Sequence, residues 1–316
     1  MPTLYKQPKL GNLENKVENA KPAKLVRTAL HIHTYISNPS LGREDYLKRA
    51  LLSKYLTQAS IKNVKLLAIT NIKDNLEQVI LEEIHKGLIQ KNKIEKVSNA
   101  MFVYNPQGDN PIFLLRGMEW HVYNTKAGHV CLIGINKQEP VHEELSRYDN
   151  ILDVVKYSND VAALTVLCHP FSKLSGGVDE SMLKKLLTQE SLSFALELNP
   201  TVLEFNILQL QDVLAKKILK YSAYKPIVAS QDSHDGLLTH SYTLVNEQVF
   251  SNMETIPEAF ASQIYNNKHG IEFKTNPLTH TLTWVFAQRC VFEPESIVKF
   301  LIQNLKKQLK LDKNAV

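Results

Sequence analysis

Short apolar segments alternate with longer amphipathic stretches over the middle of the chain. Apolar runs bounded by polar residues are typical of buried strands, and apolar residues at every third or fourth position are typical of helices. The predicted strands cover residues 26–33, 64–70, 112–122, 129–135, 161–169, 194–199 and 226–230. The predicted helices between them cover residues 44–56, 76–89, 181–187 and 202–220. This alternation over seven main strands predicts an α/β fold, built as a parallel barrel or as an open sheet.

One pair of strands departs from the alternation. Residues 112–122 and 129–135 are close in sequence, and the turn between them contains Asn124 and Gly128. Two strands joined by so short a turn have no room for a crossover helix. We therefore expect these two strands to form an antiparallel hairpin within an otherwise parallel arrangement.

The two ends of the chain differ from its middle. Residues 1–24 are polar, basic and punctuated by proline, with no periodicity, so we expect a flexible tail. After residue 245 the pattern is mostly helical, with one helix over 257–268 and another over 296–309. The pattern divides the chain into a tail (1–24), a barrel (25–245) and a helical C-terminal extension packed on the barrel (246–316).

Composition agrees with one large globular domain. The chain has 316 residues, of which 44% are hydrophobic and 22% are charged, so it can bury a sizeable core. No apolar run approaches the length of a membrane span, and the polar N-terminus does not resemble a secretory signal. The cysteines Cys131, Cys168 and Cys290 are few and have apolar neighbours. We therefore expect reduced core thiols in a cytoplasmic protein that has no membrane partner.

The net charge of +5 comes largely from lysines near the two ends of the chain. A basic surplus can attract phosphorylated ligands or nucleic acid. Solvated lysines on two mobile ends explain the same surplus without a partner. The sequence contains no recognisable nucleic-acid-binding motif and no stripe of interleaved aromatic and basic residues. A nucleic-acid partner is therefore possible from the charge, but no motif supports it.

Histidines and carboxylates recur at the ends of the predicted strands. Imidazole and carboxylate groups are the ligands that hold Zn, Mn or Fe in proteins. A barrel gathers the C-terminal ends of its strands at one rim, and a hairpin return would bring a residue that opens a strand to the same rim. The candidate metal ligands at that rim are His31, His33, Glu119, His129, His169, Asp232 and His234.

Three of these candidates lie in two strands, and each has a plainer explanation. His31 and His33 are two apart, so a regular strand would direct both to one side and allow them to share an ion. Without an ion they are simply polar residues at the end of a strand. Glu119 can offer one oxygen to each of two ions, or it can pair with a basic residue at the surface. His121 shares a face with Glu119 and competes with it as a ligand.

The other candidates have similar alternatives. His129 can be a turn histidine, His169 can be a hydrogen-bonded core group, and Asp232 can cap a helix. The small-residue loop over 172–177 either covers a substrate or is a flexible connection. The prediction of a metal site depends on the whole set of candidate ligands, because each short motif in it is common in proteins by itself.

The ordered set His-x-His, Gly-x-Glu, Gly-His, His-Pro and Asp-x-His, over residues 25 to 245, resembles the PHP (polymerase and histidinol phosphatase) family, in particular its CehA-like branch. The resemblance implies a distorted (β/α)7 barrel with two or three divalent ions and hydrolysis of phosphoesters. By this resemblance one ion would be held by His31, His33, Glu119 and Asp232, a second by Glu119, His129 and His169, and a third by a set that includes His234.

The chain departs from the family pattern at the third ion. Members of the family usually have another histidine shortly after His-x-His, where this chain has Ser37, Asn38 and Pro39. They also carry Asp-His after the second strand, where Ile72 stands in the place of the histidine. We therefore predict two ions (Mn, Zn or Fe), or a third site too weak to fill.

The function predicted from these residues is that of a metal-dependent hydrolase acting on a phosphorylated small molecule. Lys173, Arg43 or Lys73 would neutralise charge on the phosphoryl group, and His234 would protonate the leaving oxygen. A catalytically inactive metal-binding scaffold and a nuclease or nucleic-acid-processing accessory are the alternatives. Hydrolysis of an amide or a carboxylic ester is a further one, since the same ions polarise carbonyls.

Overall fold

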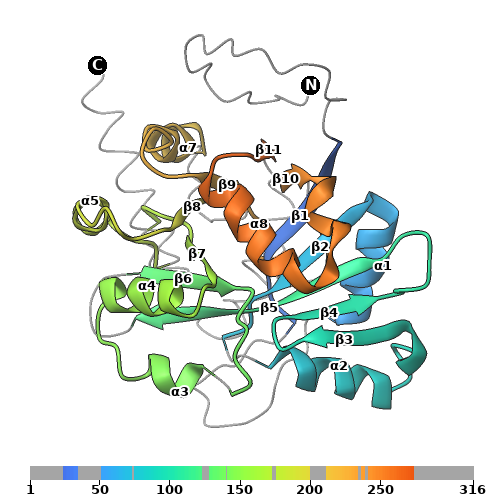
Figure 1. Ribbon diagram of the computed structural model, residues 1–316. Coiled ribbons are helices and arrows are strands. Elements are labelled where there is room, and N and C mark those ends of the chain that lie inside the picture. The colour runs from blue at the N-terminus through green and yellow to red at the C-terminus, as the bar shows by residue number, and fades with distance from the viewer. Residues whose placement is uncertain are drawn as a thin grey trace, which may run out of the picture. The chain divides into compact units, whose positions relative to one another are not determined.

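The computed structural model describes residues 24–34, 51–72, 75–122, 128–139, 141–172, 176–199, 211–233, 236–238 and 241–273. The strands in this part of the chain form one mixed sheet of eleven strands (Figure 1). They are β1 (Leu25–Ile32), β2 (Val64–Ile69), β3 (Ile94–Ser98), β4 (Met101–Tyr104), β5 (Ile112–Val122), β6 (Gly128–Ile133), β7 (Leu164–Leu167), β8 (Ala195–Leu198), β9 (Ile227–Ala229), β10 (Tyr242–Asn246) and β11 (Gly270–Glu272). The α-helices are α1 (Leu52–Lys62), α2 (Leu76–His85), α3 (His142–Leu145), α4 (Ile151–Asp160), α5 (Glu180–Leu187), α7 (Gln211–Leu219) and α8 (Ile256–Tyr265). The predicted tail before residue 24, the helix predicted over 296–309, and Arg43, Lys73, Lys173 and His234 lie outside the described residues.

Seven strands follow one another around a nearly closed barrel, in the order β1-β2-β5-β6-β7-β8-β9. Neighbours are parallel except at β6, which runs antiparallel to β5 and to β7. Beyond β9 the chain returns to β1, where Ile32 and Ser233 form an isolated parallel bridge. There the backbone N–H of His33 donates to the Ser233 carbonyl at 2.9 Å, and the N–H of Ser233 donates to the His31 carbonyl at 3.2 Å. The predicted α/β class and the predicted hairpin are confirmed, and the predicted barrel is nearly closed.

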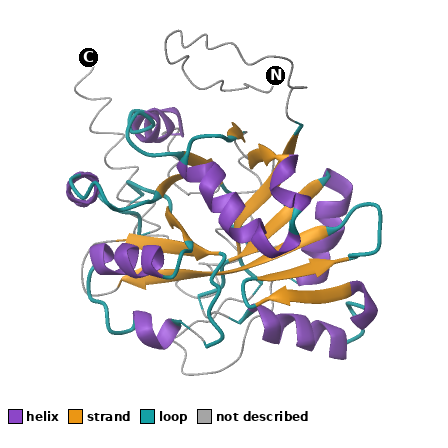
Figure 2. Cartoon of the chain, in the orientation of Figure 1, coloured by secondary structure: helices purple, strands orange, loops and turns teal. Residues whose placement is uncertain are grey.

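The inside of the barrel is an apolar core that α8 covers at one end. The strands supply Val26, Leu30, Leu66, Ala68, Leu115, Ile133, Val166, Ala195 and Val228 to this core. The helix α8 adds Ile256, Phe260 and Ile264, and Figure 2 shows it lying against the strands. The hydroxyl of Tyr265, at the end of α8, accepts a hydrogen bond from the Thr165 N–H at the start of β7. The helix therefore covers the N-terminal ends of the parallel strands, and the opposite end carries the candidate site.

Two further cores lie outside the barrel, under the helices on its two sides (Figure 1). On one side α1 and α2 pack against β1, β2 and the first half of β5. On the other side α4, α5 and α7 pack against β6, β7, β8 and β9. Both faces of these strands are thus buried, which explains why they are apolar runs rather than alternating patterns. None of the described helices is long and apolar enough to cross a membrane.

The structure adds elements that the pattern did not predict. Residues 91–111, for which the pattern predicted neither a helix nor a strand, contain β3 and β4, which form a hairpin on the edge of β5. The residues of β3 are half-buried or exposed, so its sequence lacks the apolar signal of the barrel strands. Likewise, β10 and β11 extend the sheet beyond β1. The pattern predicted no strand for β10, at the end of the predicted barrel region, and β11 lies where it predicted mostly helix. The predicted helix at 257–268 is confirmed as α8, while Gly270 begins a strand.

A buried carboxylate of α2 caps the start of α1. Glu83 is only 2% exposed, and its two oxygens accept hydrogen bonds from the Leu52 N–H at 2.5 Å and the Ser53 N–H at 2.9 Å. The residue at the N-cap, Leu51, makes no side-chain hydrogen bond. The first N–H groups of a helix lack partners within the helix and carry partial positive charge. Glu83 therefore supplies hydrogen-bond acceptors to the first N–H groups of α1, and these bonds link α2 to α1.

Replacing Glu83 by alanine should lower the free energy of unfolding by about 2 to 3 kcal/mol, because it leaves two N–H groups at a helix start without an acceptor. Urea unfolding followed by circular dichroism measures this change. The control is Glu82→Ala on the preceding residue, which removes the exposed pair with Lys86 and should cost about 0.5 kcal/mol. Equal stability of the two variants would contradict the capping role.

Candidate metal centre

Six of the seven predicted ligands lie in the described residues, and the structure brings all six together at one end of the barrel. His31 belongs to β1 and His33 follows it, Glu119 lies in β5, and His129 lies in β6. His169 comes shortly after β7, and Asp232 comes shortly after β9. Because β5 and β6 pair with His121 opposite His129, the hairpin return carries His129 to the same rim as the ends of the parallel strands.

The carboxylate of Glu119 lies at the centre of this group. Its Oε1 atom is 3.4 Å from His31 Nε2, 3.0 Å from His129 Nδ1 and 3.5 Å from His169 Nε2. Its Oε2 atom is 3.5 Å from His33 Nε2. Glu119 is 5% exposed, so these contacts are largely shielded from water. One carboxylate thus faces both halves of the cluster.

The six described ligands fall into two sets of three. One set is His31, His33 and Asp232, and the other is Glu119, His129 and His169; within each set the ligand atoms lie within 4.8 Å of one another. In the first set, Asp232 Oδ1 is 3.6 Å from His31 Nε2 and 3.4 Å from His33 Nε2. With metal–ligand bonds of about 2.1 Å, neighbouring ligands of one tetrahedral ion lie about 3.4 Å apart. The observed spacings therefore suit ligation of an ion by each set.

Buried nitrogens without hydrogen bonds also fit a metal. His31 Nε2 and His129 Nδ1, which both face Glu119, are shielded from solvent and make no hydrogen bond of good geometry in the described part of the chain. A buried polar atom without a partner destabilises a fold by about 1 to 3 kcal/mol, so such atoms are rare unless something binds them. The residues present therefore fit divalent ions, and the protein can be described as having a buried His/Glu/Asp cluster able to bind metal.

The backbone is strained at three of the six ligands. His31 has φ 60°, His169 has φ 30° and Asp232 has φ 42°, a region that residues other than glycine seldom adopt. At His31 the pairing of β1 with β2 also shifts, since Ala29 pairs with Leu67 and Ile32 with Ile69. Backbone strain concentrates at functional sites, and a bulge re-aims a side chain. His31 and His33 do meet, with ring centroids 5.0 Å apart, but through this bulge rather than through the regular strand that the sequence suggested.

Glu197 is a buried member of the site that sequence reasoning missed. It is 0% exposed, and its Oε1 atom lies 2.5 Å from His31 Nδ1. The same carboxylate accepts hydrogen bonds from the Ser230 hydroxyl and the His169 N–H. A hydrogen bond from Nδ1 fixes the imidazole so that Nε2 presents its lone pair to a metal. The available signal was a glutamate inside the apolar strand β8, a position where an unpaired charge would be costly.

The charges in the cluster stabilise one another. Burial alone would lower the pKa of His31, but the surrounding acidic groups, foremost Cys131 and Glu197, raise it well above its ordinary value. Burial alone would raise the pKa of Glu119, but His31, His121 and His129 lower it well below its ordinary value. His129 differs, since burial lowers its pKa to about 4. At neutral pH His129 is therefore uncharged, which is the form that binds metal.

His121 and Asn71 border the cluster, and neither is among the seven predicted ligands. His121 Nε2 lies 3.2 Å from Glu119 Oε2, and its ring stacks on that of His129 at 3.7 Å. Asn71, next to Ile72, accepts a hydrogen bond from the Thr34 N–H at 2.8 Å and donates to the Thr34 hydroxyl. The segment after β2 thus ties down the segment after β1 with an amide, where the family pattern has metal ligands.

Gly176, within the small-residue loop predicted over 172–177, approaches His129 closely. Gly176 has φ +73°, and a Cβ atom placed there would lie 2.7 Å from His129 Nε2. The ends of the loop are held by hydrogen bonds from the Gly177 N–H to the Ser172 carbonyl and from the Phe171 N–H to the Val178 carbonyl. The backbone at Gly176 therefore packs directly on a candidate ligand, and only glycine fits there.

No protein-family model and no curated protein matches this sequence. Among solved structures, the chain is similar to the crystal structure of PsfC from Pseudomonas syringae PB-5123, with a TM-score of 0.48 and 13% sequence identity. The match covers 86% of this chain and 99% of that chain. The likeness is distant, so the function proposed below depends on the geometry of the cluster and on the sequence motifs.

Replacing Glu197 by glutamine should weaken divalent metal binding by about tenfold to a hundredfold, because the charged hydrogen bond that orients His31 is lost. Calorimetric titration of the metal-free protein with Zn²⁺ measures the change. Glu190→Gln, an exposed position just before β8, is the control and should bind like the parent. Unchanged affinity in Glu197→Gln would show that His31 is oriented by other contacts.

Replacing Gly176 by alanine should displace His129 and weaken binding at the Glu119, His129 and His169 set by about tenfold. The control is Gly87→Ala, which has nearly the same backbone angle (φ +70°) but no atom within 4 Å of its added Cβ. Both variants carry the backbone strain, about 1 kcal/mol each. A loss of metal affinity in both, or in neither, would contradict a specific contact with His129.

Proposed function

We propose that the protein is a metal-dependent hydrolase of the PHP type and that its substrate is a phosphoester. One observation carries the proposal: the buried carboxylate of Glu119 faces the ligand atoms of both three-residue sets, His31 and His33 on one side and His129 and His169 on the other. A carboxylate in that position can serve two ions at once. The order of the motifs along the chain, which resembles the PHP family, supports the choice of phosphoester over other substrates.

Two bound divalent ions would supply a water of lowered pKa and positive charge for the oxygens of the phosphoryl group. The chain's own residues have separate tasks. His31, His33 and Asp232 hold one side of the centre, and Glu197 keeps the His31 ring in place. The strained backbone at His31 and Asp232 is held by the bridge between the residues that follow them, Ile32 and Ser233. The ligands therefore need little rearrangement to bind.

The outer side of the centre is formed by His121 and His129, whose side chains are 19% and 22% exposed. They are the most accessible of the clustered histidines, so a substrate would approach from their side. His129, with a pKa of about 4 because of burial, is neutral at physiological pH and offers a lone pair rather than a charge. Protonation of the leaving oxygen by His234 and charge neutralisation by Lys173 remain predictions, since both residues lie outside the described part of the chain.

A metal-binding scaffold without catalysis is the alternative that the same experiment separates from a hydrolase. Both functions require the ligand clusters, so metal binding alone does not distinguish them. Hydrolysis of phosphoesters does, when it depends on the same residues as the metal. The test therefore measures metal content and activity on the same preparations.

Replacing Glu119 by glutamine should lower the metal content from about two ions per chain to one or none, and should reduce phosphoesterase activity at least about a hundredfold. Elemental analysis gives the metal content after reconstitution with Mn²⁺ or Zn²⁺, and a panel of phosphomonoesters and phosphodiesters gives the activity. Glu95→Gln, at an exposed position of β3, is the control.

Two outcomes would overturn the assignment. Full activity in Glu119→Gln would remove the carboxylate from the mechanism. Two ions per chain in the parent protein, with no hydrolysis of any phosphoester in the panel, would leave a metal-binding protein without the proposed activity.

A further inference from the structure

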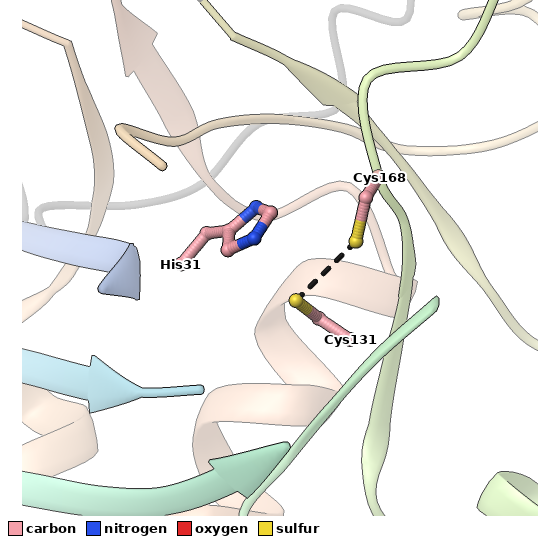
Figure 3. A group of neighbouring side chains, drawn as sticks. All are labelled: His31, Cys131 and Cys168. Atoms are coloured by element: carbon pink, nitrogen blue, oxygen red, sulfur yellow. Dashed lines mark hydrogen bonds between the residues drawn. The ribbon is translucent and has the colours of Figure 1, made fainter. Parts of the chain in front are cut away.

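Two buried cysteine side chains meet inside the barrel beside the candidate metal centre. Cys131 lies in β6 opposite Glu119 of β5, and Cys168 directly follows β7 and precedes His169. Both are free cysteines, 1% and 0% exposed. Their sulfur atoms are 3.3 Å apart, with the Cys168 thiol donating to Cys131, as Figure 3 shows. The sequence predicted reduced core thiols, and the structure adds that they form a pair.

The pair has a third neighbour that turns it into a candidate site. A ring nitrogen of His31 and the two sulfur atoms all lie within 4.8 Å of one another. In Figure 3 the His31 ring lies across from the two sulfurs, which come from the neighbouring strands. The ring has this position because of the strained backbone at His31 and the hydrogen bond to Glu197. Three ligand atoms thus converge from three different strands of the barrel.

We propose that Cys131, Cys168 and His31 hold a divalent ion of the zinc type through sulfur. Two thiolates and an imidazole are the donor set that Zn²⁺ takes in proteins, whereas Mn²⁺ and Mg²⁺ prefer oxygen. The site shares His31 with the His/Glu/Asp cluster, because His31 also belongs to the set with His33 and Asp232. This site does not require the proposed hydrolase activity. Its sulfur ligands favour a zinc-type ion over manganese at His31.

The plainer explanation is that the two cysteines are small apolar side chains filling the core. Free cysteines are often buried in this way. Apolar packing does not account for a histidine with a strained backbone at the same point. It also does not account for a ring nitrogen of His31 and both sulfur atoms converging within 4.8 Å of one another, as the ligands of one ion do. A bound ion accounts for both observations.

Titration of the metal-free protein with Co²⁺ under a phosphine reductant tests the proposal. Co²⁺ replaces Zn²⁺ in such sites, and a sulfur ligand gives an intense charge-transfer absorption in the near ultraviolet that oxygen and nitrogen ligands do not give. The background carries Cys290→Ser, so that only Cys131 and Cys168 can produce the band. We expect the band in this background, a loss of about half or more in each of Cys131→Ala and Cys168→Ala, and none in the double variant. Val166→Ala, a buried position of β7 paired with Cys131 and two residues before Cys168, is the matched control and should keep the band.

A second measurement needs no variant that might fail to fold. X-ray absorption at the zinc edge of the reconstituted parent protein should show sulfur scatterers at about 2.3 Å in addition to nitrogen and oxygen at about 2.0 Å. Cobalt bound without the charge-transfer band, zinc surrounded by nitrogen and oxygen alone, or a Cys131–Cys168 disulfide in the reduced preparation would each overturn the proposal. A sulfur-bound ion in a protein that hydrolyses no phosphoester would uphold this site and reject the proposed function.

Discussion

The hydrogen bond between the buried carboxylate of Glu197 and the His31 imidazole is the interaction on which the candidate site depends. Glu197 lies in β8, His31 lies in β1, and the same carboxylate also accepts from the Ser230 hydroxyl after β9 and the His169 N–H after β7. One side chain, 0% exposed, therefore joins the ends of four strands. A carboxylate so deep in the protein is tolerable only because every contact compensates its charge, so the position of each strand end is constrained by the others.

This constraint explains why strained backbone persists at the rim. The positive φ angles of His31, His169 and Asp232 would relax if the ends of their strands were free. The bridge between Ile32 and Ser233, together with the hydrogen bond from the His33 N–H to the Ser233 carbonyl, holds the ends of β1 and β9 together. The side chains are thereby aimed into the barrel mouth before any ligand arrives. Such preorganisation suits metal binding, because ligands that are already converged lose little entropy when an ion binds.

Much of the fold and part of the site follow from the sequence, for physical reasons that differ. The strands of the barrel are buried on both faces, so they can be predicted from their apolar runs. The hairpin of β5 and β6 can be predicted from the short connection between them. The strands β3 and β11 are short and partly exposed, and they form only because a neighbouring strand offers an edge. The ligands at strand ends are predictable as a set, because a barrel gathers those ends. Glu197 and the pairing of Cys131 with Cys168 depend on contacts between strands that no local pattern encodes.

His31 belongs to both candidate ligand sets, so the identity of the bound ion affects which set can form. His31 Nε2 lies 3.4 Å from Glu119 Oε1 and 3.6 Å from Asp232 Oδ1, and a ring nitrogen of His31 also lies within 4.8 Å of the sulfurs of Cys131 and Cys168. A single imidazole nitrogen gives its lone pair to one ion only. An ion drawn towards sulfur would leave Asp232 and His33 to a weaker site, while an ion drawn towards oxygen would leave two thiols beside two buried carboxylates. Sulfur ligands and oxygen ligands rank the metal ions differently by affinity, so the ion that the cell supplies would decide which of the two ligand sets His31 joins. That choice would also decide whether the centre contains one strongly bound ion or two.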